Sequence, residues 1–212
     1  FVTSFEIASK MIDNNQYKNI IIVSSEIASK GLNPNNRETI TLFGDAAAAV
    51  IVSYQEHGDS SFIKGAMNTH SQGVFSTLIK GGGNKYFFKD YPYDENLHSF
   101  AMDGPKLLKL ARKEIKGFLL NFFKDIPYTL EDVDVVIPHQ TSKIGHMLLK
   151  KTLNTNEVKI MSNLSDNGNC ISASIPLLFH QSIQNGKINR GDLCLFIGTS
   201  AGFSIGASLF RF

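Results

Sequence analysis

Apolar residues along this chain recur either every three to four positions or in short unbroken runs, a pattern typical of helices that alternate with buried strands. The first helix shows the helical spacing clearly, because Phe1, Phe5, Ala8 and Ile12 share one face. The predicted helices span residues 1–14, 104–123, 171–184 and a segment from 141 or 142 to 153. The predicted strands span residues 20–23, 46–53, 133–137, 158–161, 193–197 and 203–210. This alternation predicts an α/β fold.

The pattern weakens between residues 61 and 103. We expect short strands at 62–67 and 74–79, followed by the glycine run 81–83 and an aromatic stretch. Residues 81–98 are predicted to form a surface insertion or lid, with an ordinary packed loop as the alternative.

Two segments of the chain share one order of elements. Residues 1–53 and 171–212 each run helix, asparagine stop, apolar strand, turn of small residues, strand. The repeat predicts two related α/β halves. We therefore divide the chain into the remainder of a first half (1–60), a connecting or insertion region (61–103) and a second half (104–212). Because Phe1 already lies in the middle of a helical pattern, we expect the chain to be part of a longer protein.

Composition narrows the possible functions. The formal net charge of +2 is small and the lysines are dispersed, so nucleic acid is not an expected partner. The longest apolar run, Ala46 to Val52, is too short to cross a bilayer. Two cysteines, Cys170 and Cys194, make no disulfide framework and suit the reducing cytoplasm. The six histidines show no metal-ligand spacing, and the glycine run lacks the Lys-Ser/Thr pair of a phosphate-binding loop.

Two polar residues stand where an α/β protein builds its site. His139 follows the apolar run Val135–Pro138, and polar groups beyond the carboxyl end of such a strand often form a site. Asn169 lies in the turn Asn167-Gly168-Asn169 ahead of a predicted helix. An imidazole and an amide can each donate an N–H to one developing oxyanion. The alternative for each residue is a structural side chain in a strand-end or glycine turn.

Five motifs resemble β-ketoacyl-acyl-carrier-protein synthase III. The motifs are Val136–Gln140, Asn167–Asn169 with the Ser-Ala-Ser that follows, Ala201–Phe212, Thr41–Val50 and Met102–Gly104. This resemblance implies the thiolase-like five-layered αβαβα fold, built from two duplicated halves. Here the first half is expected to be truncated and the second complete.

The resemblance also implies a Cys-His-Asn site. In the family the nucleophilic cysteine belongs to a Cys-x-Gly-Phe motif at the head of the first helix. Phe1 resembles the phenylalanine of that motif, which would place the cysteine three residues upstream. Cys170 and Cys194 do not match it, so no nucleophile is expected within these 212 residues, and the chain alone is expected to be inactive.

The implied reaction is a decarboxylative Claisen condensation of acyl-CoA with malonyl-acyl carrier protein. His139 and Asn169 would donate to the thioester oxygen, and Ser200, Ala201 and Gly202 would shape the acyl oxyanion loop. No metal or cofactor is implied, since CoA and phosphopantetheine only carry the substrates. The family further implies a cytoplasmic homodimer in fatty-acid biosynthesis.

Residues that would contact the partners depart from the family pattern. Arg37 matches an arginine that lies against the CoA adenine, although a surface arginine is the alternative. Lys143 is expected to dock acyl carrier protein, because Ile144 replaces the usual basic residue. Pro105 and Ser142 replace two asparagines that contact pantetheine. These changes fit secondary metabolism at least as well as fatty-acid initiation.

Two other functions stay open. One is acyl transfer to oxygen or nitrogen without carbon–carbon bond formation, and the other is a non-catalytic partner subunit of a condensing enzyme. The presence of both His139 and Asn169 favours an enzyme, because a subunit without chemistry has no need of two donors.

Overall fold

The computed structural model describes residues 1–13, 15–154 and 160–212. The longer helices are α1 (Val2–Asp13), α4 (Gly104–Phe123), α5 (Lys143–Leu153) and α7 (Ser174–Gln184). The short helices are α2 (Arg37–Ile40), α3 (Glu95–His98) and α6 (Leu164–Asn167), with 3-10 turns at Ala28–Gly31, Ser71–Gly73, Leu130–Asp132 and Ile171–Ala173. The strands are β1 (Asn19–Glu26), β2 (Ala46–Ser53), β3 (Ser61–Thr69), β4 (Thr77–Ile79), β5 (Phe100–Met102), β6 (Val135–Pro138), β7 (Leu193–Ser200) and β8 (Ser204–Arg211).

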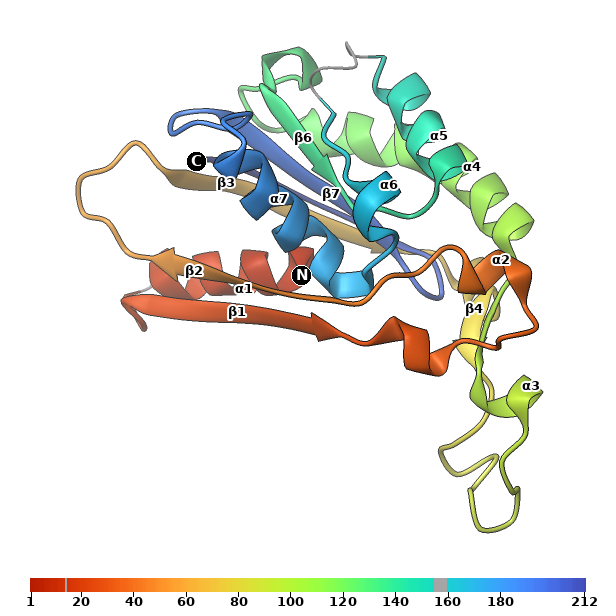
Figure 1. Ribbon diagram of the computed structural model, residues 1–212. Helices are drawn as coiled ribbons and strands as arrows, with labels where there is room; N and C mark the ends of the chain where they lie inside the picture. Colours follow the sequence, from red (N-terminus) through yellow and green to blue (C-terminus); the bar gives the residue numbers. More distant parts are fainter. Residues whose placement is uncertain (14, 155–159) are drawn as a thin grey trace.

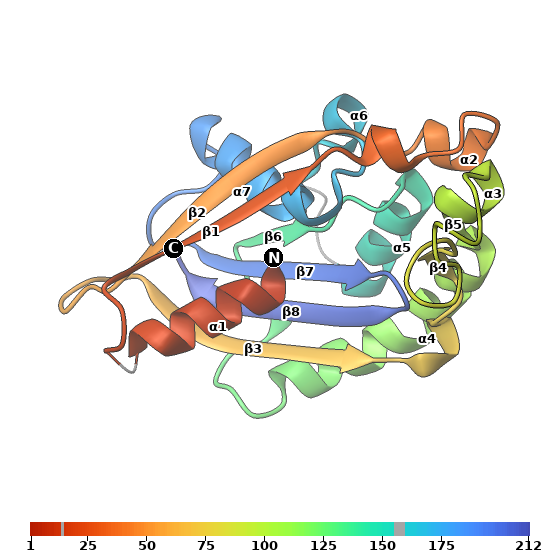
Figure 2. The same cartoon turned by 90° about the horizontal axis from the view of Figure 1, so that it is seen from below.

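A four-stranded mixed sheet in the order β3-β8-β7-β6 forms the centre of the molecule (Figure 2). β6 and β7 are parallel, and the other two pairs are antiparallel. Side chains of β7 alternate between two cores: Leu195 packs with residues of α4 and α5, whereas Phe196 packs with residues of α1 and α7. Helices cover both faces of the sheet, which explains why its central strands read as unbroken apolar runs.

The second sheet is the antiparallel pair β1–β2, which lies beyond α1 and α7 (Figure 1). Its inner face packs on these helices, with Ile22 in the same core as Phe5 and Phe196. The layers are therefore α4 and α5, the four-stranded sheet, α1 and α7, and the β1–β2 pair. This is the helix–sheet alternation that the sequence predicted.

The repeat predicted from the sequence is present in the structure. α1, β1 and β2 follow the same order as α7, β7 and β8, and both strand pairs are antiparallel. The division of the chain at residues 60 and 103 stays a prediction. Within its middle part, β3 pairs with β8 and so belongs to the four-stranded sheet.

The segment between β4 and β5 projects from the body as a separate arm (Figure 1). Several of its contacts are internal: Gly82 and Tyr86 exchange backbone hydrogen bonds, and the rings of Tyr93 and His98 stack 5.4 Å apart. This geometry agrees with a surface projection, while its role as a lid stays a prediction.

Several predicted boundaries were wrong: the strand expected at 20–23 spans Asn19–Glu26, and the strand expected at 133–137 spans Val135–Pro138. Three further differences follow from the local backbone. The strand expected from residue 74 begins at Thr77, because the N–H of Val74 bonds to Ser71 and continues a 3-10 turn. The last strand starts one residue late because Phe203 has a φ of 66°, which is left-handed. Ile171 also has a positive φ, so α7 is preceded by a 3-10 turn.

The strand expected at 158–161 is described only in part, and no membrane-spanning helix is found among the described residues. Of the strand expected at 158–161, residues 158 and 159 lie outside the described residues, and Ile160 forms an isolated bridge with Val136. Within the described ranges, no helix is long and apolar enough to cross a membrane.

Candidate functional site

His139 lies at the carboxyl end of β6, as predicted. Its backbone N–H donates to the carbonyl of Ile197 at 2.8 Å, which ties the turn to β7. Gly198 packs beside it, and a Cβ at that glycine would come within 3.0 Å of the His139 Cβ. A small cavity of about 60 Å³ lies at this position, lined in part by His139, Thr141 and Thr199. The backbone bond between the two parallel strands β6 and β7 thus holds the turn that carries the imidazole at the carboxyl end of β6.

The environment of His139 keeps its imidazole neutral. Burial is the largest cause of a shift that lowers the pKa of His139 to about 4. A neutral imidazole has one N–H donor and one acceptor nitrogen. His139 can therefore donate a hydrogen bond at neutral pH without carrying a charge.

Asn169 is held by backbone pairing with the segment before β2. Its N–H donates to the carbonyl of Leu42 at 2.9 Å, and its carbonyl accepts from the N–H of Gly44 at 3.1 Å. The side-chain Oδ1 accepts from the N–H of Ile171 at 2.9 Å, whereas Nδ2 donates to the carbonyl of Thr141 at 3.5 Å. Thr141 follows His139 by two residues, so the structure brings the two predicted motifs together. Whether both side chains reach one oxygen stays a prediction.

Two glycines allow the close approach around Asn169. A Cβ at Gly44 would lie 1.9 Å from the carbonyl oxygen of Asn167, which no side chain tolerates. Gly168 has a φ of 66° and lies against the carbonyl of Leu42. The Phe-Gly-Asp and Asn-Gly-Asn motifs are therefore two sides of one contact, although they lie far apart in the sequence.

The predicted oxyanion loop lies at the same end of the sheet. Ser200 ends β7, Ala201 is exposed, and Gly202 has a φ of 72°. The N–H of Gly202 donates to Thr77 Oγ1 at 3.0 Å, and the carbonyl of Phe203 accepts from the N–H of His70 at 2.9 Å. Gly202 and Phe203 both have left-handed backbone conformations, and the hydrogen bonds to Thr77 and His70 hold the turn in place. Its role in binding an acyl oxygen stays a prediction.

Neither cysteine is an activated nucleophile. Burial raises the pKa of the Cys170 thiol, Asp45 raises it further, and Sγ donates to the carbonyl of Asn167 at 3.1 Å. Burial raises the pKa of Cys194 to about 12, with Asp192 and Asp134 acting in the same direction. Since the thiolate is the reactive form, both thiols are inert near neutral pH.

The two predicted partner-binding residues lie on the surface. Arg37 is exposed at the first position of α2, which Asn36 caps. Lys143 is exposed at the first position of α5, where Ser142 caps the helix by accepting from Gly145 at 3.1 Å. Their roles toward CoA and carrier protein stay predictions. In the described part of the chain, no three His, Cys, Asp or Glu residues cluster as a metal site.

The sequence prediction missed the importance of Gln140, the neighbour of His139. Its side chain is 1% exposed, and its Nε2 donates to the carbonyl of Pro138 at 2.8 Å. Its Oε1 accepts from Ser162 Oγ at 2.9 Å. A second polar residue so soon after a buried strand was the signal that could have revealed it.

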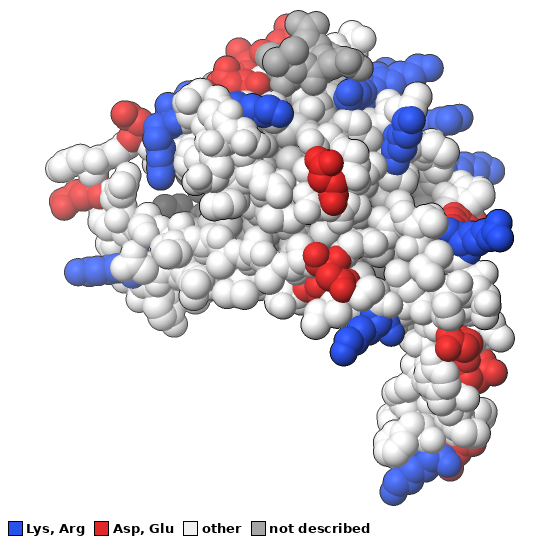
Figure 3. Space-filling model, viewed as in Figure 1, with Lys and Arg blue, Asp and Glu red and all other residues white. Residues whose placement is uncertain are grey.

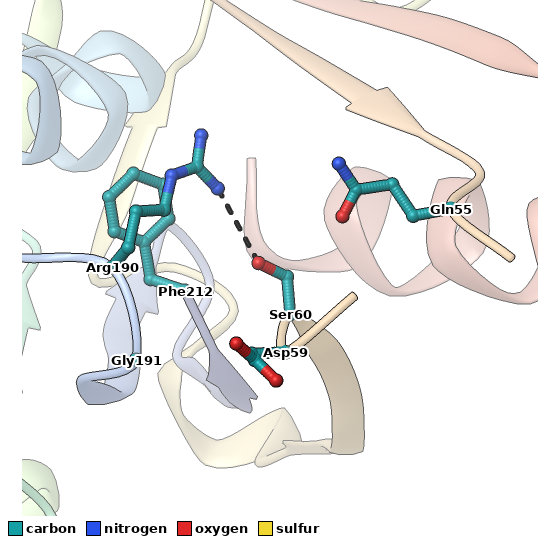
Figure 4. Close-up of a pocket in the computed structure, with 6 residues that line it drawn as sticks. All are labelled: Gln55, Asp59, Ser60, Arg190, Gly191 and Phe212. Atoms are coloured by element: carbon teal, nitrogen blue, oxygen red, sulfur yellow. Dashed lines mark hydrogen bonds between the residues drawn. The ribbon is translucent and has the colours of Figure 1, made fainter. Parts of the chain in front are cut away.

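A larger cavity of about 400 Å³ lies at the other end of the strands (Figure 4). Arg190 stacks 4.0 Å from the ring of Phe212 and donates to Ser60 Oγ at 3.4 Å. Gly191 precedes β7 and Phe212 follows β8, so this cavity is a sheet length from Ser200. None of the predicted site residues lines it.

Two family models match the chain. The description "3-Oxoacyl-[acyl-carrier-protein (ACP)] synthase III" matches residues 1–71, and the C-terminal model of the same family matches residues 123–212. Residues 72–122, which include the projecting arm, lie between the two matches.

Curated relatives and solved structures agree with these models. β-Ketoacyl-[acyl-carrier-protein] synthase III of Aliarcobacter butzleri is 31% identical over 214 residues, and that of Clostridioides difficile is 28% identical over 211 residues. Each alignment covers 100% of this chain and 64% of the relative's length. The crystal structure of the Aquifex aeolicus synthase III superposes with a TM-score of 0.86 at 28% identity, covering 100% of this chain and 64% of that one.

The expected fold and family are both confirmed. Two models of one family match the first and last parts of the chain, the C-terminal model at the C-terminal end. The solved relative shares the arrangement of helices and strands over the whole chain. The chain is a thiolase-like protein that belongs to the 3-oxoacyl-[acyl-carrier-protein] synthase III family, also called the β-ketoacyl-[acyl-carrier-protein] synthase III family.

Proposed function

We propose that this protein takes part in the decarboxylative condensation of an acyl thioester with a malonyl thioester. A cysteine upstream of Phe1 would first take the acyl group from acyl-CoA, with CoA leaving as the free thiol. The malonyl group then loses carbon dioxide, and the resulting enolate carbon attacks the acyl-cysteine carbonyl. The new carbon–carbon bond forms as the carbon–sulfur bond breaks, and the cysteine leaves as a thiolate.

The contact between Asn169 Nδ2 and the carbonyl of Thr141 is the observation that carries this proposal. It brings an amide donor to the turn that holds the neutral imidazole of His139. During decarboxylation, negative charge builds on the malonyl thioester oxygen. Two N–H donors aimed at that oxygen would stabilise the enolate, and each is typically worth about 3–4 kcal/mol of barrier. A neutral imidazole suffices, because this step removes no proton from the substrate.

Basic residues on α4 and α5 support carrier protein as the malonyl donor. The exposed ones are Lys106, Lys109, Arg112, Lys113, Lys116, Lys143 and Lys151. Figure 3 shows Lys and Arg side chains along the α4–α5 edge, whereas the middle of that face is mostly uncharged. A basic edge would attract an acidic protein and fix its orientation. The proposed docking surface for the carrier protein therefore includes Lys143 and the other basic residues of this edge. Arg37 is proposed to lie against the adenine of CoA.

The test separates the two chemical steps in the protein extended upstream of Phe1. We expect His139→Ala to lower carbon dioxide release from malonyl-acyl carrier protein by roughly a hundredfold to a thousandfold. The extent of cysteine acylation, measured by mass spectrometry of the intact protein, should change little.

The matched control is His57→Ala, since His57 is an exposed histidine in the loop between β2 and β3. Equal loss of both steps in His139→Ala would mean that His139 activates the nucleophile instead. Acylation without any decarboxylation in the unsubstituted protein would favour acyl transfer to oxygen or nitrogen. Absence of both steps would favour a non-catalytic subunit.

A further inference from the structure

We propose that Asn163 and Gln181 are positioning residues that set the separation between His139 and Asn169. A chain of amide side chains leads from the neighbour of His139 to the turn that carries Asn169. The structural part of this inference stands alone, and its effect on catalysis rests on the proposed function.

The first link joins His139 to the segment before α6. Gln140 follows His139 directly, and its buried Oε1 accepts from the backbone N–H of Asn163 at 3.3 Å as well as from Ser162. Its Nε2 bonds to the carbonyl of Pro138, the residue before His139. The amide of Gln140 therefore spans the turn and ties both sides of His139 to Asn163.

The second link crosses to α7 and returns. Asn163 is buried, and its Nδ2 donates to Gln181 Oε1 at 2.7 Å. The Nε2 of Gln181 then donates to Asn167 Oδ1 at 3.3 Å. Gln181 accepts from one neighbour through its oxygen and donates to the other through its nitrogen, which an amide side chain can do at once. Gln181 is thus the bridge between the two turns.

The third link closes a ring. Asn167 is separated from Asn169 only by Gly168, and Asn169 Nδ2 bonds to the carbonyl of Thr141 beside Gln140. A closed ring resists changes in the distance between its members more than an open chain does, because every bond must adjust together. Among the described residues, Asn163 Oδ1 is buried without a hydrogen-bond partner, so the side chain of Asn163 is held through its bond from Nδ2 to Gln181.

The test uses substitutions at the bridge in the protein extended upstream of Phe1. Gln181→Met keeps the length of the side chain but removes both hydrogen bonds. Gln181→Glu is the conservative rescue, because a carboxylate accepts from Asn163 and the Asn167 amide can rotate to donate to it. His180→Ala is the matched control, since His180 is the exposed neighbour on the same helix.

Two readouts are needed. The side-chain amide resonance of Asn169, followed by NMR, should move in Gln181→Met and stay in place in Gln181→Glu and His180→Ala. Malonyl decarboxylation should fall about tenfold to a hundredfold in Gln181→Met, because small misplacements of a donor cost rate steeply. Acylation should be unaffected.

The outcomes separate the inference from the proposed function. An unmoved Asn169 resonance in Gln181→Met would overturn the inference, whether or not the protein decarboxylates malonyl thioesters. A moved resonance with an unchanged decarboxylation rate would overturn the catalytic role. A moved resonance in a protein that never decarboxylates would support the ring and contradict the proposed function. If Gln181→Met fails to fold, Asn167→Ala opens the same ring from the surface side and should give the same shift.

Discussion

His139 combines a strand-end position with an apolar environment, and these two properties have different origins. The strand end was predictable, because Pro138 interrupts an unbroken apolar run. The neutral state was not, since it depends on burial against Gly198, which belongs to another strand. Asn169 shows the same division. Its turn was predicted from Asn-Gly-Asn, but its backbone partners Leu42 and Gly44 come from a distant segment.

The lowered pKa of His139 predicts a loss of stability in acid. Its folded-state pKa of about 4 lies below the ordinary value of 6.5, so the unfolded chain binds the proton more readily. The stabilisation is complete above pH 6.5, declines as the pH falls toward 4, and then levels off. The total loss from this residue should be at most about 3 kcal/mol.

Urea denaturation of the protein and of His139→Gln between pH 7.5 and pH 4 checks this prediction. The difference in unfolding free energy between the two proteins should shrink as the pH falls. A difference that stays constant, or grows, would show that the imidazole is not held neutral. His57→Gln controls for the removal of an exposed histidine.

Among the elements, long helices and buried strands were predicted well because their signals are local. α4 shows a helical apolar face, and β7 begins with the unbroken apolar run Leu193–Ile197. Elements shaped by distant contacts were missed. Phe203 takes a left-handed conformation where the N–H of His70 bonds to its carbonyl, and no local signal marks that turn in a phenylalanine.

The contact between the segment before β2 and the Asn169 turn predicts a strong effect of Gly44→Ala. The new Cβ would lie 1.9 Å from the Asn167 carbonyl oxygen, so the two segments must separate. We expect a loss of about 1–3 kcal/mol in unfolding free energy. Thermal and chemical denaturation measure it.

Gly31→Ala is the matched control, because a Cβ there would meet nothing within 4 Å. It should leave stability nearly unchanged. Equal stability of the Gly44→Ala and Gly31→Ala variants would contradict the close approach of the two segments and, with it, the placement of Asn169.

At the scale of the whole molecule, the layers and the repeat were predicted from the sequence. The outer face of β1 and β2 is apolar and uncovered in this chain: Ile21, Val23 and Ile51 are 63%, 64% and 68% exposed. Ile21 and Ile51 are cross-strand partners, and Val23 pairs with Ala49, so these side chains form one surface. The chain spans about 64% of the length of its curated relatives, and the homodimer implied by the family stays a prediction.

This outer face predicts self-association of the 212-residue chain. An exposed apolar surface on a strand pair favours contact with another copy. Light scattering should detect oligomers, and the double substitution Ile21→Thr and Ile51→Thr should reduce them. Leu120→Thr is the control, because Leu120 is 68% exposed but lies on α4. A monodisperse monomer of the unsubstituted chain would contradict the prediction.

The central claim is that His139 and Asn169 donate to the same oxygen. A crystal structure of the protein extended upstream of Phe1, bound to a malonyl thioester analogue that cannot decarboxylate, tests it most directly. We expect a ring nitrogen of His139 and the Nδ2 of Asn169 each at about 3 Å from the thioester oxygen. Side-chain nitrogens more than about 8 Å apart in that complex could not share one oxygen, and such a result would contradict the claim.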